Sequence, residues 1–457
     1  MNSWLFFKTA VSRVVYFAFG LFVVLGLVTP SWRYGPFSWW PLLSFERLAG
    51  APVTPGVLNL LPVIVGLGWL TARLANGRIS PSALWHPPGI TLPLAGLTAL
   101  GLASMDPASP RRLFIYTGAL ALMWLVYLFT RDERPFLPPI LATIILIQSS
   151  VALGQFFRQG DLGLVTLGEL PLNPAFSGIT VLFARGTRWL RAYGLTAHPN
   201  LLGAILMLAL LLLWPHYGRS RSWQKAGYGM VIAVGLCGLF VSFSRAAWLA
   251  MGSGIIVWWG DKRPFSPTRH QFITHLLPTL PLLLFILTYG DLALSRFTAL
   301  NTPIESQSIN QRTSDIQIAL HIITANPLHG VGMGNYLSAA RPFNEYAVVV
   351  HNVPLLVTAE LGLPGLALWL WLILTPFQLY RQGRLSGEQI APWVAMIVIN
   401  QFDTMLWAGS NWQTGIMFGL LTGLVAQTKI THDESTAIFS TSLRQNEASK
   451  TRHEEYG

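Results

Sequence analysis

The stretch Val350–Leu370, VHNVPLLVTAELGLPGLALWL, decides how this chain must fold. It is apolar for most of its length, and a membrane-spanning helix needs about 20 mostly apolar residues. His351 and Asn352 stand at its entrance, and Glu360 lies about two turns further in. Ionisable groups at such positions are costly, and they usually face a cavity, a partner or a pathway. We therefore expect a membrane helix that begins beside a functional site; a capped helix start with a packed histidine is the simpler alternative.

The composition of the whole chain is that of a membrane protein. Of its 457 residues, 52% are hydrophobic and 11% are charged, whereas soluble domains carry about 25% charged residues. The 18 Trp and 25 Phe suit membrane interfaces. A single cysteine, Cys237 in an apolar run, excludes an internal disulfide and a cysteine metal cage, and we expect it to be a packed thiol. The net charge of +11 reflects orientation in a bilayer, so no nucleic-acid partner is expected.

The apolar stretches predict an all-α polytopic integral membrane protein with about 12 transmembrane helices. The predicted spans lie near residues 13–30, 57–72, 88–104, 113–130, 136–157, 199–214, 227–242, 246–260, 272–289, 353–376, 392–408 and 411–428. Residues 1–428 would then form one polytopic membrane domain. The polar tail 429–457, rich in Ser, Thr and Glu, is predicted to be poorly ordered.

The distribution of positive charge predicts which side each loop faces. With the N-terminus in the cytoplasm, the inner side receives all five lysines, which are Lys8, Lys225, Lys262, Lys429 and Lys450. Both termini are then cytoplasmic, and the outer face keeps arginines. Arginine presents a planar, always charged fork that suits phosphate. Arg191 and Arg245 stand at helix entrances beside other polar residues, whereas Arg296 and Arg341 are interpreted as ordinary loop charges.

Two outer segments are long, at about 158–198 and about 290–352. The second contains an amphipathic helix, predicted from apolar residues at helical spacing. These are Ile309, Ile316, Ala319, Leu320 and Ile323. Asn326-Pro327 would end this helix, which either lies on the membrane surface or covers a site. The Gly-rich GVGMGN that follows is predicted to be a tight loop closing the helix.

Three polar clusters fall at the outer ends of predicted helices. His198 and Asn200 flank Pro199, a residue well placed in a first helical turn. Ser244 and Arg245 lie between two apolar runs, and His351 with its neighbour opens the quoted stretch. Because the spans could have scattered these clusters over both faces, their agreement indicates one site on the outer face.

In this order, the clusters resemble the O-antigen ligase and Wzy-type O-antigen polymerase superfamily. The motifs are RAYGLTAHPN (191–200), SFSRA (242–246), NPLHGVGMGNY (326–336) and HNVPLLVTAELGLPGL (351–366). The resemblance covers roughly residues 110–428 and is best over 188–366. It implies an inverting glycosyltransferase of the GT-C type in the bacterial inner membrane, with its active site on the periplasmic face. The implied donor is a glycan on undecaprenyl diphosphate, with no cofactor, no metal and no nucleotide sugar.

The resemblance also implies residue roles. Arg191, Arg245 and Arg312 would hold the lipid diphosphate, and His351 would act at the acceptor. The acceptor would be another glycan, a lipid A core or a protein. Elementary chemistry agrees, because a diphosphate gains charge as the glycosidic bond breaks and prearranged arginines stabilise that charge. An acceptor hydroxyl must lose a proton, and histidine titrates near neutral pH.

Supporting roles are predicted for the neighbours of these residues. Asn352 would cap the helix or orient the imidazole, and His198, next to Asn200 and near Ser244, would bind substrate or cap its helix. Glu360 lies nine residues after His351, which is about 2.5 turns, so it points away from the face of that histidine. We therefore expect Glu360 to be an interhelical partner, for an arginine in particular.

Two other functions remain open at this stage. A peptidoglycan-type lipid II glycosyltransferase would share the outer site and would need a critical aspartate in the large loop, a place that Asp315 occupies. A small-solute transporter of the bicarbonate kind would need charged or broken helices near mid-membrane. Asp403 is predicted to be buried in the penultimate span, paired with an arginine or lining the cavity.

Cysteine labelling in sealed cells tests the predicted topology. With Cys237 replaced by alanine, a cysteine at Ser308 should react with an impermeant reagent added outside, because the large loop is predicted to be periplasmic. A cysteine at Ser435 should react only after the membrane is opened. Labelling of position 435 from outside would contradict the cytoplasmic tail.

Overall fold

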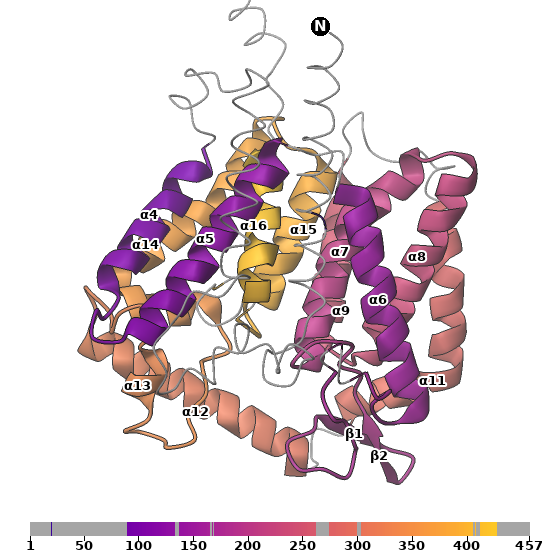
Figure 1. Ribbon diagram of the computed structural model, residues 1–457, viewed down its shortest axis with the longest axis horizontal. Coiled ribbons are helices and arrows are strands. Elements are labelled where there is room, and N and C mark those ends of the chain that lie inside the picture. Colours follow the sequence, from indigo (N-terminus) through magenta and orange to yellow (C-terminus); the bar gives the residue numbers. More distant parts are fainter. Residues whose placement is uncertain are drawn as a thin grey trace, which may run out of the picture.

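The computed structural model describes residues 89–132, 137–164, 169–261, 274–298, 303–404 and 412–426, with the single positions 20, 167 and 407. The predicted spans 13–30, apart from Gly20, and 57–72 lie outside these residues, as does the tail 429–457. The described chain is mainly helical (Figure 1).

Helices occupy the other predicted spans. They are α4 (Thr91–Ser104), α5 (Pro110–Asp132), α6 (Leu137–Arg158), α7 (Pro199–Arg219), α8 (Ser222–Val241), α9 (Arg245–Gly260), α11 (Leu280–Thr298), α14 (Val353–Arg381), α15 (Gly387–Ile399) and α16 (Trp412–Ala426). Within the described residues, 5 helices are long and apolar enough to cross a membrane. The mainly helical, membrane-spanning architecture is thus confirmed, whereas the total of about 12 spans is not.

The apolar helices differ in whether they are buried inside the protein or exposed at its surface. α7 is apolar on every side and almost entirely buried, which is the pattern of a central helix. α11 is equally apolar but exposes large side chains, as a helix facing lipid would. The exposed side chains include Leu280, Leu283, Leu284 and Leu287. On α8, the thiol of Cys237 is free and buried, as predicted.

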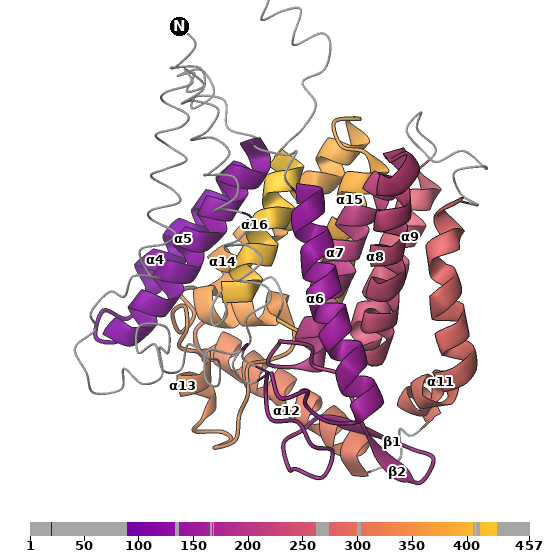
Figure 2. The same ribbon diagram turned by 45° about the vertical axis from the view of Figure 1, so that its right-hand side comes forward.

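The two ends of the helix layer carry different structures. At one end, α12 (Pro303–Ala325), α13 (Tyr336–Ala340) and a β-hairpin lie across the helices (Figures 1 and 2). At the other end, Arg219 of α7 pairs with Glu388 of α15 at 2.7 Å. The carboxylate of Asp261, after α9, accepts a hydrogen bond of 2.7 Å from Gly387 N at the start of α15. Lys225 lies near the start of α8, at this second end.

The hairpin corrects the all-α prediction. β1 (Val181–Ala184) and β2 (Thr187–Leu190) pair antiparallel within the outer segment 158–198. Arg185 and Gly186 join them with φ of 52° and 72°, the positive values that tight hairpin turns need. Arg185 also pairs with Asp291 of α11 at 2.6 Å, which ties the hairpin to that helix. Strands of four residues are too short for a clear alternating pattern in the sequence.

Two predicted boundaries are also corrected. The span placed at 272–289 starts near its predicted position, because helical structure begins at Thr274 and passes through a 3-10 turn over Leu277–Thr279 into α11. Its end is corrected, since α11 continues to Thr298. The span placed at 392–408 ends at Ile399, so Asp403 lies in the turn after α15 rather than within the helix.

A break in α14 receives the glycine-rich loop. Gly362 has φ 67° and ψ −168°, which interrupts the helix. The loop that follows α12 docks at this break, where Leu363 N donates to Pro327 O at 2.8 Å and Val331 N donates to Ala359 O at 2.9 Å. The predicted tight loop and the break in α14 therefore form one joint, which connects α12 to a membrane helix.

Substituting Gly362 with alanine should destabilise this joint. A Cβ there would meet the carbonyl group of Leu328. The backbone conformation is also one that essentially only glycine adopts, at a cost of about 1–3 kcal/mol for other residues. We expect a lower thermal midpoint in detergent. The matched control is Gly252→Ala in α9, where a Cβ meets nothing within 4 Å. Equal midpoints for the two variants would show that the break tolerates a side chain.

Candidate active site

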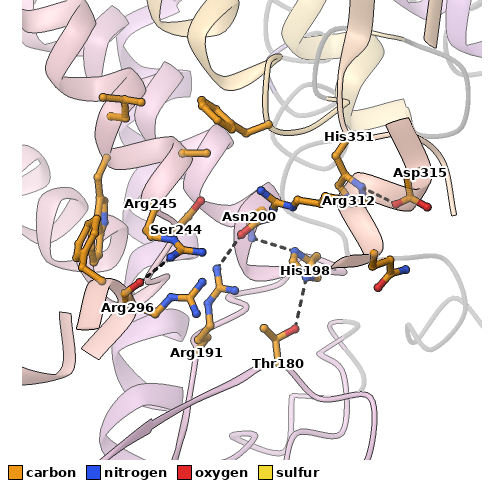
Figure 3. Close-up of a pocket in the computed structure, with 16 residues that line it drawn as sticks. Thr180, Arg191, His198, Asn200, Ser244, Arg245, Arg296, Arg312, Asp315 and His351 are labelled. Atoms are coloured by element: carbon orange, nitrogen blue, oxygen red, sulfur yellow. Dashed lines mark hydrogen bonds and ion pairs between the residues drawn. The ribbon is translucent and has the colours of Figure 1, made fainter. Parts of the chain in front are cut away.

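A cavity of about 610 Å³ lies where α12 crosses the ends of the membrane helices (Figure 3). Its lining brings together residues from α7, α9, α11, α12 and the segment before α14. The charged and polar side chains among them include Arg191, His198, Asn200, Ser244, Arg245, Arg296, Arg312, Asp315 and His351. Seven of these were singled out as candidate site residues in the sequence, so residues far apart in the chain converge on one place.

Three helices begin around this cavity. His198 is the N-cap of α7, Ser244 is the N-cap of α9, and His351 lies two residues before α14. Helix N-termini carry partial positive charge and unpaired N–H groups, both of which favour anions. The backbone therefore adds to the positive character that the arginine side chains give the cavity.

Arg191 is held on two sides and is only 4% exposed. Its Nε donates to the carbonyl oxygen of Ser242 at 3.0 Å, and its Nη2 donates to Asn200 Oδ1 at 2.7 Å. The amide nitrogen of Asn200 donates in turn to Asp403 Oδ2 at 3.2 Å. Asn200 therefore links the guanidinium group to a carboxylate. Asp403 was predicted to pair with an arginine or to line the cavity; among the described residues it instead contacts Asn200, and it lies outside the cavity lining.

Arg245 is placed by the sharp turn between α8 and α9. Phe243, which is buried, has φ 49°, an uncommon value for a bulky residue. Ser244 Oγ accepts from Ala247 N at 3.4 Å and so caps α9. Arg245 is the first residue of that helix, and its Nη1 donates to the carbonyl oxygen of Arg296 at 2.6 Å.

Arg296 was not recognised in the sequence. We interpreted it as a loop charge, but α11 continues to Thr298 and brings Arg296 to the cavity wall. The misplaced end of this helix hid Arg296, because a span that ends near residue 289 leaves this residue in a loop. Arg341, interpreted in the same way, is exposed and lies outside the cavity lining.

The amphipathic helix is α12, and it ends at Ala325, directly before Asn326-Pro327, as predicted. Its buried stripe is rotated from the predicted one, since Ile316 and Leu320 are exposed while Ile318 and Ile322 are buried. The predicted stripe missed that Asp315 belongs to the inward face. Arg312 and Asp315 are three residues apart, so they share a face, and both line the cavity.

His351 meets Asp315 across the cavity rim. His351 Nδ1 lies 3.9 Å from Asp315 Oδ2, and the two side chains are 35% and 2% exposed. Burial raises the pKa of the Asp315 carboxyl, and the positive charges of His351 and Arg312 act against that rise. No local sequence pattern indicates this pair, because its members lie 36 positions apart in the chain.

His198 has a different environment. Its Nδ1 accepts a hydrogen bond of 3.1 Å from Asn200 N, and its Nε2 lies 3.4 Å from Thr180 Oγ1. Desolvation lowers its pKa to about 3, and the nearby charge of Arg191 contributes to this shift. The imidazole is therefore neutral near pH 7 and carries its hydrogen on Nε2, which makes it a donor. Of the two predicted roles, the helix cap is present, and the ring also lines the cavity.

Asn352 and Glu360 support the site from outside its lining. Asn352 caps α14, because its Oδ1 accepts from Leu355 N at 3.0 Å. Glu360 is 3% exposed and accepts from Gly334 N at 3.0 Å and from Trp407 Nε1 at 2.7 Å. The prediction that it partners an arginine is therefore wrong, and its carboxylate instead secures the glycine-rich loop.

Comparisons with known proteins identify the central part of the chain. Residues 228–370 match the family described as O-antigen ligase, and this range contains Arg245, Arg312 and His351. No curated protein gives a match. The family and the membrane-length helices together indicate a glycosyl-transferring enzyme of the bacterial inner membrane. The resemblance to the O-antigen ligase and polymerase superfamily is thereby confirmed over residues 228–370, the part of the chain that is similar to the O-antigen ligase family.

Proposed function

We propose that this protein transfers a glycan from undecaprenyl diphosphate to an acceptor hydroxyl on the periplasmic face, with inversion and without a metal ion. The observation that carries the proposal is the cavity itself. Four arginines and a histidine paired with a carboxylate line one cavity at the ends of membrane helices. A lipid-linked diphosphate needs both the positive charge and the adjacent membrane.

The arginines suit the departure of a diphosphate. As the bond between the sugar C1 and the phosphate oxygen breaks, its electron pair leaves with the diphosphate. Arg191 and Arg245 are already oriented by backbone carbonyl groups, so their charge is available without reorganisation. Arg296 and Arg312 add charge to the same cavity. This concentration of positive charge performs the task for which other transferases use a divalent cation.

His351 is the residue proposed to take the proton from the acceptor hydroxyl. Its Nδ1 faces Asp315, so Nε2 is the nitrogen that remains to take the acceptor proton. The acceptor oxygen then forms a bond to C1 on the face opposite the departing diphosphate, which inverts the configuration. His198 does not fit this role, because its Nδ1 is already an acceptor and its Nε2 carries the hydrogen.

The apolar part of the cavity wall supports a lipid donor. Trp248 and Leu249 of α9 and Phe297 of α11 line it beside the arginines. Leu249 is 56% exposed and Phe297 is 54% exposed. A prenyl chain attached to the bound diphosphate would meet apolar side chains here and the lipid-facing surface of α11 beyond.

The two alternatives rank below this proposal. A lipid II glycosyltransferase would use the same lipid diphosphate, and the presence of Asp315 in the cavity suits it, but the O-antigen ligase match favours a ligase or polymerase. A transporter of the bicarbonate kind would place its charged groups near mid-membrane. Here the arginines gather at helix ends.

Incubation of purified protein with an undecaprenyl-diphosphate glycan tests the proposal. Parallel reactions supply a second glycan, lipid A core, a serine-containing protein or no acceptor, with EDTA throughout, and the released lipid diphosphate is measured. We expect release that depends on an acceptor. Transfer from lipid II alone would favour the peptidoglycan alternative, and restoration of activity by Mg²⁺ would contradict metal independence. Absence of release with every acceptor would refute the proposal.

Arg191→Lys and Arg245→Lys should each lower transfer by about 10- to 100-fold. Lysine keeps the charge but lacks the fork, and a hydrogen bond to a charged group contributes about 1.5–3 kcal/mol. Initial rates at matched protein concentration measure the effect. Arg341→Lys is the control, since Arg341 is exposed outside the cavity. Near-normal rates for both cavity variants would count against recognition of the diphosphate by a guanidinium fork.

His351→Gln should lower turnover by about 10²–10⁴-fold, because positioned acid–base groups contribute that much. Binding of the lipid diphosphate should change far less. His321→Gln is the matched control, since His321 is exposed on α12 and lies outside the cavity lining. If His351→Gln keeps most of the wild-type rate at saturating donor, His351 is an orienting residue and the base lies elsewhere.

A further inference from the structure

We infer that Asp315 is a positioning residue for His351: its carboxylate holds the Nδ1–H of the imidazole and thereby directs Nε2 toward the acceptor hydroxyl. This inference rests on the proposed function and adds to it a residue of α12, the helix that crosses the cavity. Asp315 would touch neither donor nor acceptor, and would act through His351.

The two facing atoms make the first argument. Asp315 Oδ2 and His351 Nδ1 are 3.9 Å apart. Each is buried, and neither has a hydrogen-bond partner within the described part of the protein. A buried polar atom without a partner is destabilising, so one hydrogen bond between these two atoms would satisfy both of them. The present distance exceeds that of a hydrogen bond, but catalytic hydrogen bonds are often long before substrate binds.

The charge of the cavity makes the second argument. Asp315 is the one acidic residue among the described residues that line it, beside four arginines. When His351 takes the acceptor proton it becomes an imidazolium ion, which those arginines would repel. Asp315 is the nearest carboxylate described, so it supplies the negative charge that makes the protonated state accessible. The same logic applies to the buried aspartate of a serine-protease triad.

The position of Asp315 is fixed by the fold. Its side chain is 2% exposed, so it does not turn toward solvent. The hydroxyl group of Tyr336 donates to its backbone carbonyl at 3.3 Å, and Ile318 and Ile322 bury the same face of α12. Within the described chain, the titratable and charged groups that face His351 are Asp315 and Arg312 of α12 and His198 before α7. The buried carboxylate of Asp315 can therefore orient the imidazole ring of His351, which is 35% exposed.

Asp315→Asn is the first test, because asparagine keeps the size and removes the charge. Turnover should fall by about 10²-fold, because a catalytic group that is no longer held in position can cost that much. The affinity for lipid diphosphate should stay near the wild-type value. Glu345→Gln is the matched control, since Glu345 is an exposed carboxylate of the same outer segment. A wild-type rate for Asp315→Asn would overturn the inference.

The dependence of rate on pH distinguishes positioning from a merely structural role. Without the carboxylate, the imidazolium ion loses its proton more easily. The acid limb of the rate profile should therefore move to lower pH in Asp315→Asn, because the negative charge that favours the imidazolium ion is gone. Asp315→Glu keeps the charge and should retain the wild-type acid limb. A lower rate with an unmoved limb would show that Asp315 only supports the fold.

The double variant completes the test. If Asp315 acts through His351, adding Asp315→Asn to His351→Gln should change the residual rate by less than about threefold, because residues that act as a unit are not additive. If the rate losses of the two single variants multiply in the double variant, the inference is overturned. A fully active His351→Gln would instead contradict the proposed base. An inactive His351→Gln beside a normal Asp315→Asn would leave the proposed function intact and refute only this inference.

Discussion

Like charges held close together are the constraint on which this structure depends. Four arginines line one cavity, and the N-termini of α7 and α9 add their partial positive charge. The fold offsets this repulsion with acceptors: the carbonyl groups of Ser242 and Arg296, the amide of Asn200 and, behind it, Asp403. These contacts orient the guanidinium groups of Arg191 and Arg245. In the function proposed above, the bound lipid diphosphate would balance this positive charge, so the same groups would serve both binding and preorganisation.

The joint at α14 keeps α12 over this cavity. The chain leaves α12, docks the glycine-rich loop at the break near Gly362, and returns through α13 to His351. Glu360 closes the joint, because its carboxylate binds Gly334 N from the loop and Trp407 from the turn after α15. This buried carboxylate, which the sequence predicted to be an interhelical partner, thus connects the loop and the segment after α15. It fixes the two segments that carry Asp315 and His351 relative to each other.

The sequence predicted the parts of the site that depend on local chemistry. Helix entrances with polar residues identified Arg191, Arg245 and His351, and cap-forming side chains identified Asn352 and His198. What it missed depends on tertiary structure. Arg296 was hidden because its helix continues beyond the apolar run, and Asp315 was hidden because packing sets which face of α12 is buried. The partners of Glu360 are a backbone N–H and a distant indole, which no local pattern encodes. The hairpin was missed because each of its strands has only four residues.

The two histidines of the cavity show how the backbone assigns chemistry to identical side chains. Nδ1 of His198 accepts a hydrogen bond from the backbone N–H of Asn200, so the neutral ring carries its hydrogen on Nε2 and is a donor there. Because desolvation lowers the pKa of this histidine, its ring adds no positive charge to the arginines around it. His351 has no such backbone partner among the described residues, and its Nδ1 faces a carboxylate instead. That arrangement leaves Nε2 as an acceptor and makes a positive ring tolerable. A transferase needs one group that donates hydrogen bonds and one that takes a proton. The two histidines differ in what faces Nδ1: a backbone N–H of α7 at His198, and the carboxylate of Asp315 at His351.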